Sequence, residues 1–269
     1  MRLVTIATHS EAYFPYLKQS CDKLNSNLEV LGWGEKWTGF SFKSMLIKNY
    51  LKNIEDNEIV CVIDSFDVIL LRPITELEQF FKKYSKMTGV KIIIGCDKAP
   101  SPIVKSISKV QFGTCHGLFL NAGTYIGYAK HLRKLINEIY ITPDLDDQVL
   151  LVKYVNKHPH LVHIDTSSLF FLTINNPTGD FIYDTNLIYV SKHKLFYRGI
   201  RPFFAHGNGN TNMIDVITSL GYKISDLKKE KIQTNRYIIQ FNKVISYYYI
   251  PIFIIITALI IWFIYKSKK

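Results

Sequence analysis

The chain has 269 residues, of which 48% are hydrophobic and 20% are charged, and this composition excludes a largely disordered or collagen-like chain. The length allows one large domain or two small ones. The formal net charge is +11, but residues 1–222 hold 24 basic and 20 acidic side chains, whereas residues 223–269 hold nine and two. Because most of the excess lies in 223–269, the charge argues against a nucleic-acid-binding surface on the folded part.

Short β-branched runs alternate with helical stretches along residues 1–222. The run Ile59–Ile63 is continuously apolar and stops at Asp64, which is typical of a strand buried on both faces. The alternation predicts an α/β fold around a mostly parallel central sheet. In chain order we predict strands at Leu3–Thr8 and Leu28–Leu31, a helix at Phe42–Ile54, a strand at Ile59–Ile63, a helix at Thr75–Tyr84, a strand at Val90–Gly95, a long loop at Lys98–His116, a strand within Leu118–Ala129, helices at Lys130–Tyr140 and Asp147–Lys157, strands at His160–Asp165, Leu187–Val190 and Phe203–Ala205, and a helix at Ile214–Leu220.

The C-terminal part carries a membrane signal. Val244–Tyr265 is a run of 22 residues without a charge, and a helix of that length would be about 33 Å long, enough for a bilayer core of about 30 Å. We therefore predict a folded domain at 1–222, a basic linker at 223–243, a single transmembrane helix at 244–265 and a basic tail at 266–269. A buried core helix is the alternative. Basic residues flank both ends of the run, so the side of the membrane on which the domain lies stays open.

Two carboxylates follow the buried strand directly, in Asp64-Ser65-Phe66-Asp67. In an open α/β sheet, ligands bind at the carboxyl ends of strands. Asp64 and Asp67 can therefore converge on one hard cation, which could bridge the phosphates of a nucleotide. The alternative is that Asp64 caps the following turn and Asp67 is solvated.

A Gly-rich turn follows the predicted strand Phe203–Ala205, in His206-Gly207-Asn208-Gly209-Asn210-Thr211. Glycines let the backbone approach a phosphate closely, and the imidazole of His206 could supply a nitrogen ligand to the same cation. The alternative is an ordinary Asn/Gly turn with a surface histidine.

Two further polar groups lie at predicted element ends. Asp146 and Asp147 open a helix, where a carboxylate caps the helix or, at the mouth of a cleft, accepts a hydrogen bond from a sugar hydroxyl. The stretch that begins with Asn121 interleaves small and aromatic residues, which suits either a close approach to a ligand or a plain buried hairpin.

The order of four motifs, VIDSFDVILL, FLNAGTYIGYA, DDQ and AHGNGNT, resembles the glycosyltransferase domain of the procollagen lysyl hydroxylases and related collagen-modifying glycosyltransferases. The resemblance runs from about Leu3 to Gly221. It implies a Rossmann-like GT-A fold, a UDP-sugar donor such as UDP-glucose or UDP-galactose, and Mn²⁺. It also implies hydroxylysine or galactosyl-hydroxylysine of a collagen-like protein as the acceptor.

The resemblance also implies roles for particular residues. Asp64, Asp67 and His206 would bind the metal, while Asn121, Asp146 and Asp147 would line the donor-sugar and acceptor side. Phe66 would stack on uracil and Thr8 would touch the base. The remaining nucleotide contacts would come from Lys43, Gly207 and Asn208.

Departures from the family pattern leave a second function open. Asn210 and Asn212 stand where the family tends to have a proline and a lysine, so a cation expected near the diphosphate is missing. The alternative to an enzyme is thus a glycosyltransferase-like binding protein that has lost turnover and is tethered to a membrane.

Overall fold

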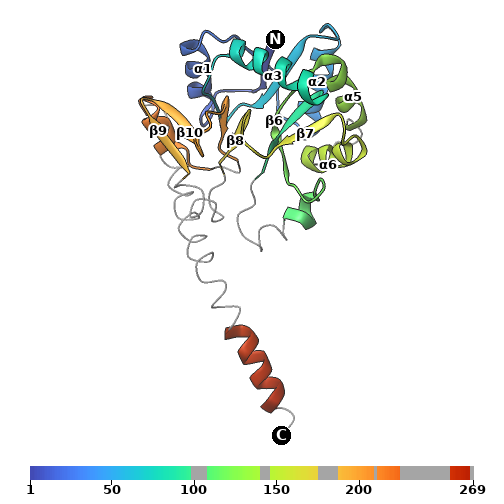
Figure 1. Cartoon of the computed structure of the whole chain (residues 1–269), viewed down its shortest axis with the longest axis vertical. Coiled ribbons are helices and arrows are strands. Elements are labelled where there is room, and N and C mark those ends of the chain that lie inside the picture. The colour runs from blue at the N-terminus through green and yellow to red at the C-terminus, as the bar shows by residue number, and fades with distance from the viewer. Residues whose placement is uncertain (98–107, 140–145, 175–186, 209–210, 225–254, 267–269) are drawn as a thin grey trace.

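The computed structural model describes residues 1–97, 108–139, 146–174, 187–208, 211–224 and 255–266 (Figure 1). Within these residues the centre of the fold is a six-stranded sheet of order β2-β1-β3-β6-β5-β7, accompanied by a three-stranded sheet of order β4-β11-β8 and a two-stranded hairpin. The chain therefore has the α/β architecture that the alternating pattern predicts.

The first three strands form the parallel half of the central sheet. β1 (Arg2–Ile6) pairs in parallel with β2 (Leu28–Leu31) on one side and with β3 (Ile59–Asp64) on the other. The chain therefore passes from β1 to β2 on one side and then crosses to β3 on the other side of β1. The carboxyl end of such a strand is a topological switch point, where α/β sheets bind their ligands.

The other half of the sheet is mixed. β6 (Leu120–Tyr128) lies antiparallel to both of its neighbours, β3 and β5 (Ile92–Cys96), whereas β7 (Val162–Asp165) is parallel to β5. The prediction of a mostly parallel sheet is therefore only partly right. A strand buried on both faces reads as an apolar run in either direction, so the sequence did not reveal the direction of β6.

Helices cover both faces of the central sheet. Val60 and Val62 of β3 belong to one core cluster, whereas Ile59, Cys61 and Ile63 belong to the other, as the two-residue period of a strand requires. Helices α2, α5 and α6 contribute to the first cluster, and α1 and α3 to the second. The helices are α1 (Phe14–Lys23), α2 (Phe40–Leu51), α3 (Ile74–Thr88), α5 (Ala129–Ile139), α6 (Asp147–Lys157) and α8 (Ile214–Ser219).

The small sheet brings distant segments together. β11 (Phe204–His206) pairs antiparallel with β4 (Val68–Leu70) and parallel with β8 (Phe171–Thr173). The sequence predicts β11 within one residue, but β4 and β8 have three residues each and are too short to show a period. Helix α1 was not predicted either, and neither was β10 (Lys194–Tyr197), which pairs with β9 (Ile188–Ser191).

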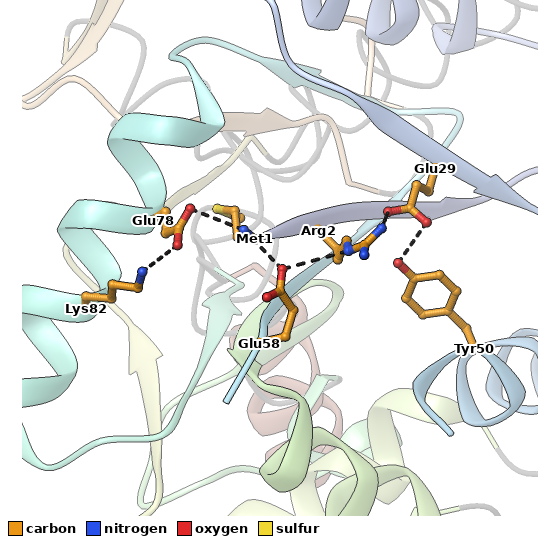
Figure 2. Close-up of polar contacts among 7 residues, drawn as sticks. All are labelled: Met1, Arg2, Glu29, Tyr50, Glu58, Glu78 and Lys82. Carbon is orange, nitrogen blue, oxygen red and sulfur yellow. Dashed lines mark hydrogen bonds and ion pairs between the residues drawn. The ribbon is translucent and has the colours of Figure 1, made fainter. Parts of the chain in front are cut away.

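Ion pairs fix the amino end of β1, opposite to the switch point (Figure 2). The amino group of Met1 lies 3.2 Å from carboxylate oxygens of both Glu58 and Glu78. Arg2 pairs with Glu29 at 3.3 Å and with Glu58 at 3.8 Å. These contacts join β1 to the segment before β3, to β2 and to α3. They hold the strand at its amino end, so its carboxyl end stays available to a ligand.

The structure describes only part of the predicted membrane segment. Residues 255–266 form a helix with exposed apolar side chains, whereas 244–254 lie outside the described residues, as do 225–243 of the linker. Within the part of the chain that is described, no helix has both the length and the apolar character needed to cross a bilayer. The predicted transmembrane helix at 244–265 is therefore not supported by the structure.

Candidate active site

Two carboxylates and an imidazole meet at the carboxyl end of β3. Asp64 is the last residue of β3, Asp67 lies in the turn before β4, and His206 ends β11. One potential ligand atom from each lies within 4.8 Å of the other two. The Nε2 atom of His206 lies 3.3 Å from Oδ2 of Asp67. Residues more than 130 positions apart in the chain thus form one cluster.

Strand pairing produces this convergence. His206 of β11 stands opposite Val68 of β4, directly after Asp67. The backbone N–H of Gly207 donates a hydrogen bond of 2.7 Å to the carbonyl oxygen of Asp67. The short β4 therefore places the turn after β3 beside the end of β11.

The cluster favours a charged Asp64 carboxylate and a basic His206 imidazole. Burial opposes a charge on His206, but the carboxylates of Asp67 and Asp64 outweigh it and raise its pKa. Burial likewise opposes a charge on Asp64, yet the Lys43 ammonium outweighs it and lowers the pKa of this carboxyl. The site is thus prepared for a positive charge next to the two carboxylates.

The residues of the cluster fit a divalent cation. The Oδ1 atom of Asp67 and both ring nitrogens of His206 are buried and have no hydrogen-bond partner among the described residues. Gly123 leaves the space beside His206 and Asp64 open, because a Cβ atom there would lie 2.4 Å from Cε1 of His206 and 2.5 Å from Oδ2 of Asp64. A mixed set of oxygen and nitrogen donors suits Mn²⁺ and related ions.

A buried lysine connects this cluster to α6. The Nζ atom of Lys43, in α2, lies 2.8 Å from Oδ1 of Asp64 and 3.1 Å from Oδ2 of Asp147. Burial raises the pKa of Asp147, although Lys43 acts in the opposite direction. Asp146 has a different role, since its side chain accepts a hydrogen bond of 2.8 Å from the backbone N–H of Gln148. Asp146 therefore caps α6, and Asp147 is the carboxylate that reaches the site.

Asn121 shapes β6 beside the cluster. Its side-chain oxygen accepts a hydrogen bond of 2.9 Å from the backbone N–H of Gly123. The pairing of β6 with β5 shifts register between Ile94 and Gly95, opposite this segment. Bulges of this kind redirect side chains near active sites. Asn121 thus fixes the strand at the point where Gly123 makes room for a ligand.

The Gly-rich turn after β11 is only partly described, since Gly209 and Asn210 lie outside the described residues. Gly207 packs tightly, because a Cβ atom there would lie 2.7 Å from Cγ of Met213. The amide of Asn208 donates a hydrogen bond of 3.3 Å to Asp97. The side-chain oxygen of Asn212 accepts a hydrogen bond from the backbone N–H of Ile214, the first residue of α8.

Aromatic rings gather at the carboxyl ends of β1 and β2. The ring of Phe66 lies 5.4 Å from that of His9 and 6.4 Å from that of Phe14, and Trp33 stacks on Phe14 at 5.4 Å. The backbone N–H of Gly34 donates to the carbonyl oxygen of Thr8. The sequence predicted roles for Phe66 and Thr8, whereas the rings of His9, Phe14 and Trp33 were not predicted. Their common signal is an aromatic or imidazole side chain shortly after a predicted strand.

The mixed sheet and the polar cluster at its switch point define an α/β domain that binds its ligand at the carboxyl ends of the central strands. The chain matches the PLOD GT domain family over residues 1–231 and belongs to this family. The family resemblance inferred from the four motifs is therefore confirmed.

Curated relatives are larger than this chain. It is 27% identical over 225 residues to procollagen-lysine,2-oxoglutarate 5-dioxygenase 1 of Gallus gallus, and 26% identical over 231 residues to the multifunctional procollagen lysine hydroxylase and glycosyltransferase LH3 of Homo sapiens. Each alignment covers 78% of this chain and 30% of the relative. The uncharacterized protein R699 of Acanthamoeba polyphaga mimivirus is 23% identical, with 77% of this chain and 45% of the relative covered.

Solved structures that resemble this chain share less of its sequence than the curated relatives do. A glycosyltransferase involved in glycosylation of the major capsid of PBCV-1 shares 12% identity with a TM-score of 0.44, covering 78% of this chain and 96% of that chain. The galactosyltransferase LgtC, solved with donor and acceptor sugar analogs, shares 16% identity with a TM-score of 0.45, covering 78% and 88%.

Proposed function

We propose that the chain is a metal-dependent glycosyltransferase that transfers a hexose, glucose or galactose, from a UDP-sugar to an acceptor hydroxyl. The observation that carries this proposal is the convergence of Asp64, Asp67 and His206 around the space that Gly123 leaves open. In a member of a glycosyltransferase-domain family, such a cluster suits the diphosphate of a nucleotide-sugar.

The described residues divide the work between them. Asp64, Asp67 and His206 would hold a divalent cation such as Mn²⁺, which would neutralise the charge that develops on the diphosphate as the sugar leaves. Phe66 offers an aromatic face to the base. Asp147, held by Lys43, would orient a hydroxyl of the donor sugar or acceptor. Fixed orientation lowers the barrier by removing rotational freedom before reaction.

The acceptor is proposed from the relatives. The names of the human and chicken relatives refer to procollagen lysine. We therefore propose hydroxylysine or galactosyl-hydroxylysine of a collagen-like protein as the acceptor of this chain. Attachment to a membrane through 244–265 is a further proposal, supported by the 22 uncharged residues of that segment.

A screen of UDP-sugars tests the proposed reaction. We expect the full chain with Mn²⁺ to release UDP from UDP-glucose or UDP-galactose, and the rate to rise when a hydroxylysine-containing collagen peptide is added. Absence of release from both donors would reject the enzymatic proposal.

The second candidate is a binding protein without turnover. Asn212 supplies no positive charge and uses its side chain to begin α8, so the diphosphate lacks the cation that the family pattern places there. Binding of UDP with Mn²⁺ in calorimetry, together with no release in the screen, would favour this candidate.

A further inference from the structure

Tyr13 contacts both of the segments that carry the candidate cation ligands. It directly precedes α1 and is buried, with 7% of its surface exposed. Its backbone N–H donates a hydrogen bond of 3.0 Å to the carbonyl oxygen of Phe66, in the turn from Asp64 to Asp67. Its phenol oxygen accepts a hydrogen bond of 2.9 Å from the backbone N–H of Met213, which is 200 positions away in the chain. One residue thus joins the turn after β3 to the segment after β11.

Met213 connects this contact to the third ligand. Met213 is fully buried, and Gly207 packs directly on it, since a Cβ atom on Gly207 would lie 2.7 Å from Cγ and 2.8 Å from Sδ of Met213. Gly207 follows His206 in the chain, and its backbone N–H donates to the carbonyl oxygen of Asp67. The position of His206 relative to Asp67 therefore depends on Met213 as well as on the pairing of β4 with β11.

Helix α1 gives Tyr13 a fixed place. The backbone N–H of Leu17 donates a hydrogen bond of 3.0 Å to the carbonyl oxygen of Tyr13, which forms the first turn of the helix. Further along α1, the Oγ atom of Ser20 accepts a hydrogen bond of 3.2 Å from the backbone N–H of Leu70 in β4. The helix is thus attached at two points to the segment around Asp67, so a shift of Tyr13 would have to move α1.

We propose that Tyr13 is a positioning residue that aligns the turn carrying Asp64 and Asp67 with the turn carrying His206, so that the three ligands meet on one cation. This inference rests on the proposed use of a divalent cation. Without the phenol oxygen, the Met213 N–H would be buried without an acceptor, and such a group is costly. The segment from His206 to Met213 can relieve this cost by moving, which would take His206 away from the two carboxylates.

The test removes the phenol oxygen and keeps the ring, in Tyr13→Phe. We expect this variant of the full chain to bind Mn²⁺ roughly tenfold more weakly, because partners that orient metal ligands typically contribute about ten- to a hundredfold to affinity. Electron paramagnetic resonance of the free ion measures the affinity. Tyr16→Phe is the matched control, since it removes a phenol hydroxyl of the same helix that donates to the carbonyl oxygen of Lys223, beyond α8. It should keep the wild-type affinity.

Hydrogen exchange at the Met213 amide is a second readout that needs no variant. In wild type this amide should exchange slowly, since it is buried and hydrogen-bonded. Mn²⁺ should slow the exchange further, because linkage between the cation and the Tyr13 contact is reciprocal. This readout decides alone if Tyr13→Phe does not fold.

The outcomes that would overturn the inference separate it from the proposed function. If wild type binds Mn²⁺ and Tyr13→Phe, folded by thermal melting, binds it equally well, Tyr13 does not align the ligands while the proposed function stands. The same conclusion follows if Tyr16→Phe weakens binding as much as Tyr13→Phe, or if bound Mn²⁺ leaves the exchange of the Met213 amide unchanged. If wild type binds no Mn²⁺, the proposed function fails and the inference fails with it.

Discussion

At the scale of single residues, Gly123 has a steric reason for its identity. It stands on β6 where any Cβ atom would overlap His206 and Asp64, and Asn121 holds its backbone N–H. The contacts of about 2.5 Å that this Cβ atom would make can be relieved only if the side chain of His206 or Asp64 moves. The cluster consists of three side chains whose potential ligand atoms all lie within 4.8 Å of one another. Such a movement would therefore disturb the whole site.

We therefore expect Gly123→Ala to weaken Mn²⁺ binding by at least roughly tenfold, since it displaces one of three ligands. Titration of free Mn²⁺ by electron paramagnetic resonance measures this directly. Gly89→Ala, at the end of α3, is the control: nothing lies within 4 Å of its new methyl group, but its φ of 79° strains an alanine there, so it reports a loss of stability without a clash at the cluster and should leave the Mn²⁺ affinity unchanged. Equal affinity in Gly123→Ala and wild type would show that the ion does not use this cluster.

The sequence predicted part of the site at this scale. Asp64, Asp67 and His206 stand at strand ends, and strand ends can be read from apolar runs, so their proximity could be expected; their binding of a metal stays a prediction. The contacts of Lys43 with Asp64 and Asp147 could not be expected, because they depend on how α2 and α6 pack. The separate roles of Asp146 and Asp147 also required the geometry of the helix end.

At the scale of elements, Lys43 joins three of them. Its ammonium lies between Asp64 at the end of β3 and Asp147 at the start of α6, while its own backbone belongs to α2. Lys43 and Asp147 are both buried. A buried carboxylate without a counter-charge is costly, so the pair connects the stability of this region to the site.

Lys43→Met is expected to lower the free energy of unfolding by roughly 3 kcal/mol, because Asp147 would remain buried and unpaired. Urea unfolding at neutral pH measures the loss. In the double variant Lys43→Met, Asp147→Leu, the buried charge is gone, and part of the stability should return. A single variant as stable as wild type would contradict the assigned ion pair.

Elements differ in how well the sequence predicts them. The helix Asp147–Lys157 has the predicted bounds, because an acidic start and an amphipathic run mark it. The strands β4 and β8 were missed since three residues carry no period. The direction of β6 was missed because direction depends on pairing partners, and apolar runs do not encode partners.

At the scale of the whole molecule, the charge separates the chain into two parts. Residues 1–222 are nearly balanced, and 223–269 carry most of the +11. The basic excess thus surrounds the uncharged segment 244–265 and lies largely outside the domain that would bind nucleotide. The proposed attachment to a membrane would place this basic excess at an anionic lipid surface.

If 244–265 anchors the chain, Ile256→Lys with Leu259→Lys should release most of the full chain from alkali-washed membranes. Each lysine at the centre of a span costs about 2.5 to 3.5 kcal/mol on insertion scales. The conservative pair Ile256→Leu, Leu259→Ile is the control. The same membrane-bound fraction for both pairs would reject the anchor.

Asp64, Asp67 and His206 are proposed to hold the cation needed for cleavage of a UDP-sugar. The most direct test is the Mn²⁺ dependence of UDP release by wild type, Asp67→Ala and the surface control Asp22→Ala. We expect wild type and Asp22→Ala to release UDP only with Mn²⁺, and Asp67→Ala to be slower by at least about a hundredfold. Equal rates in Asp67→Ala and wild type would contradict the account.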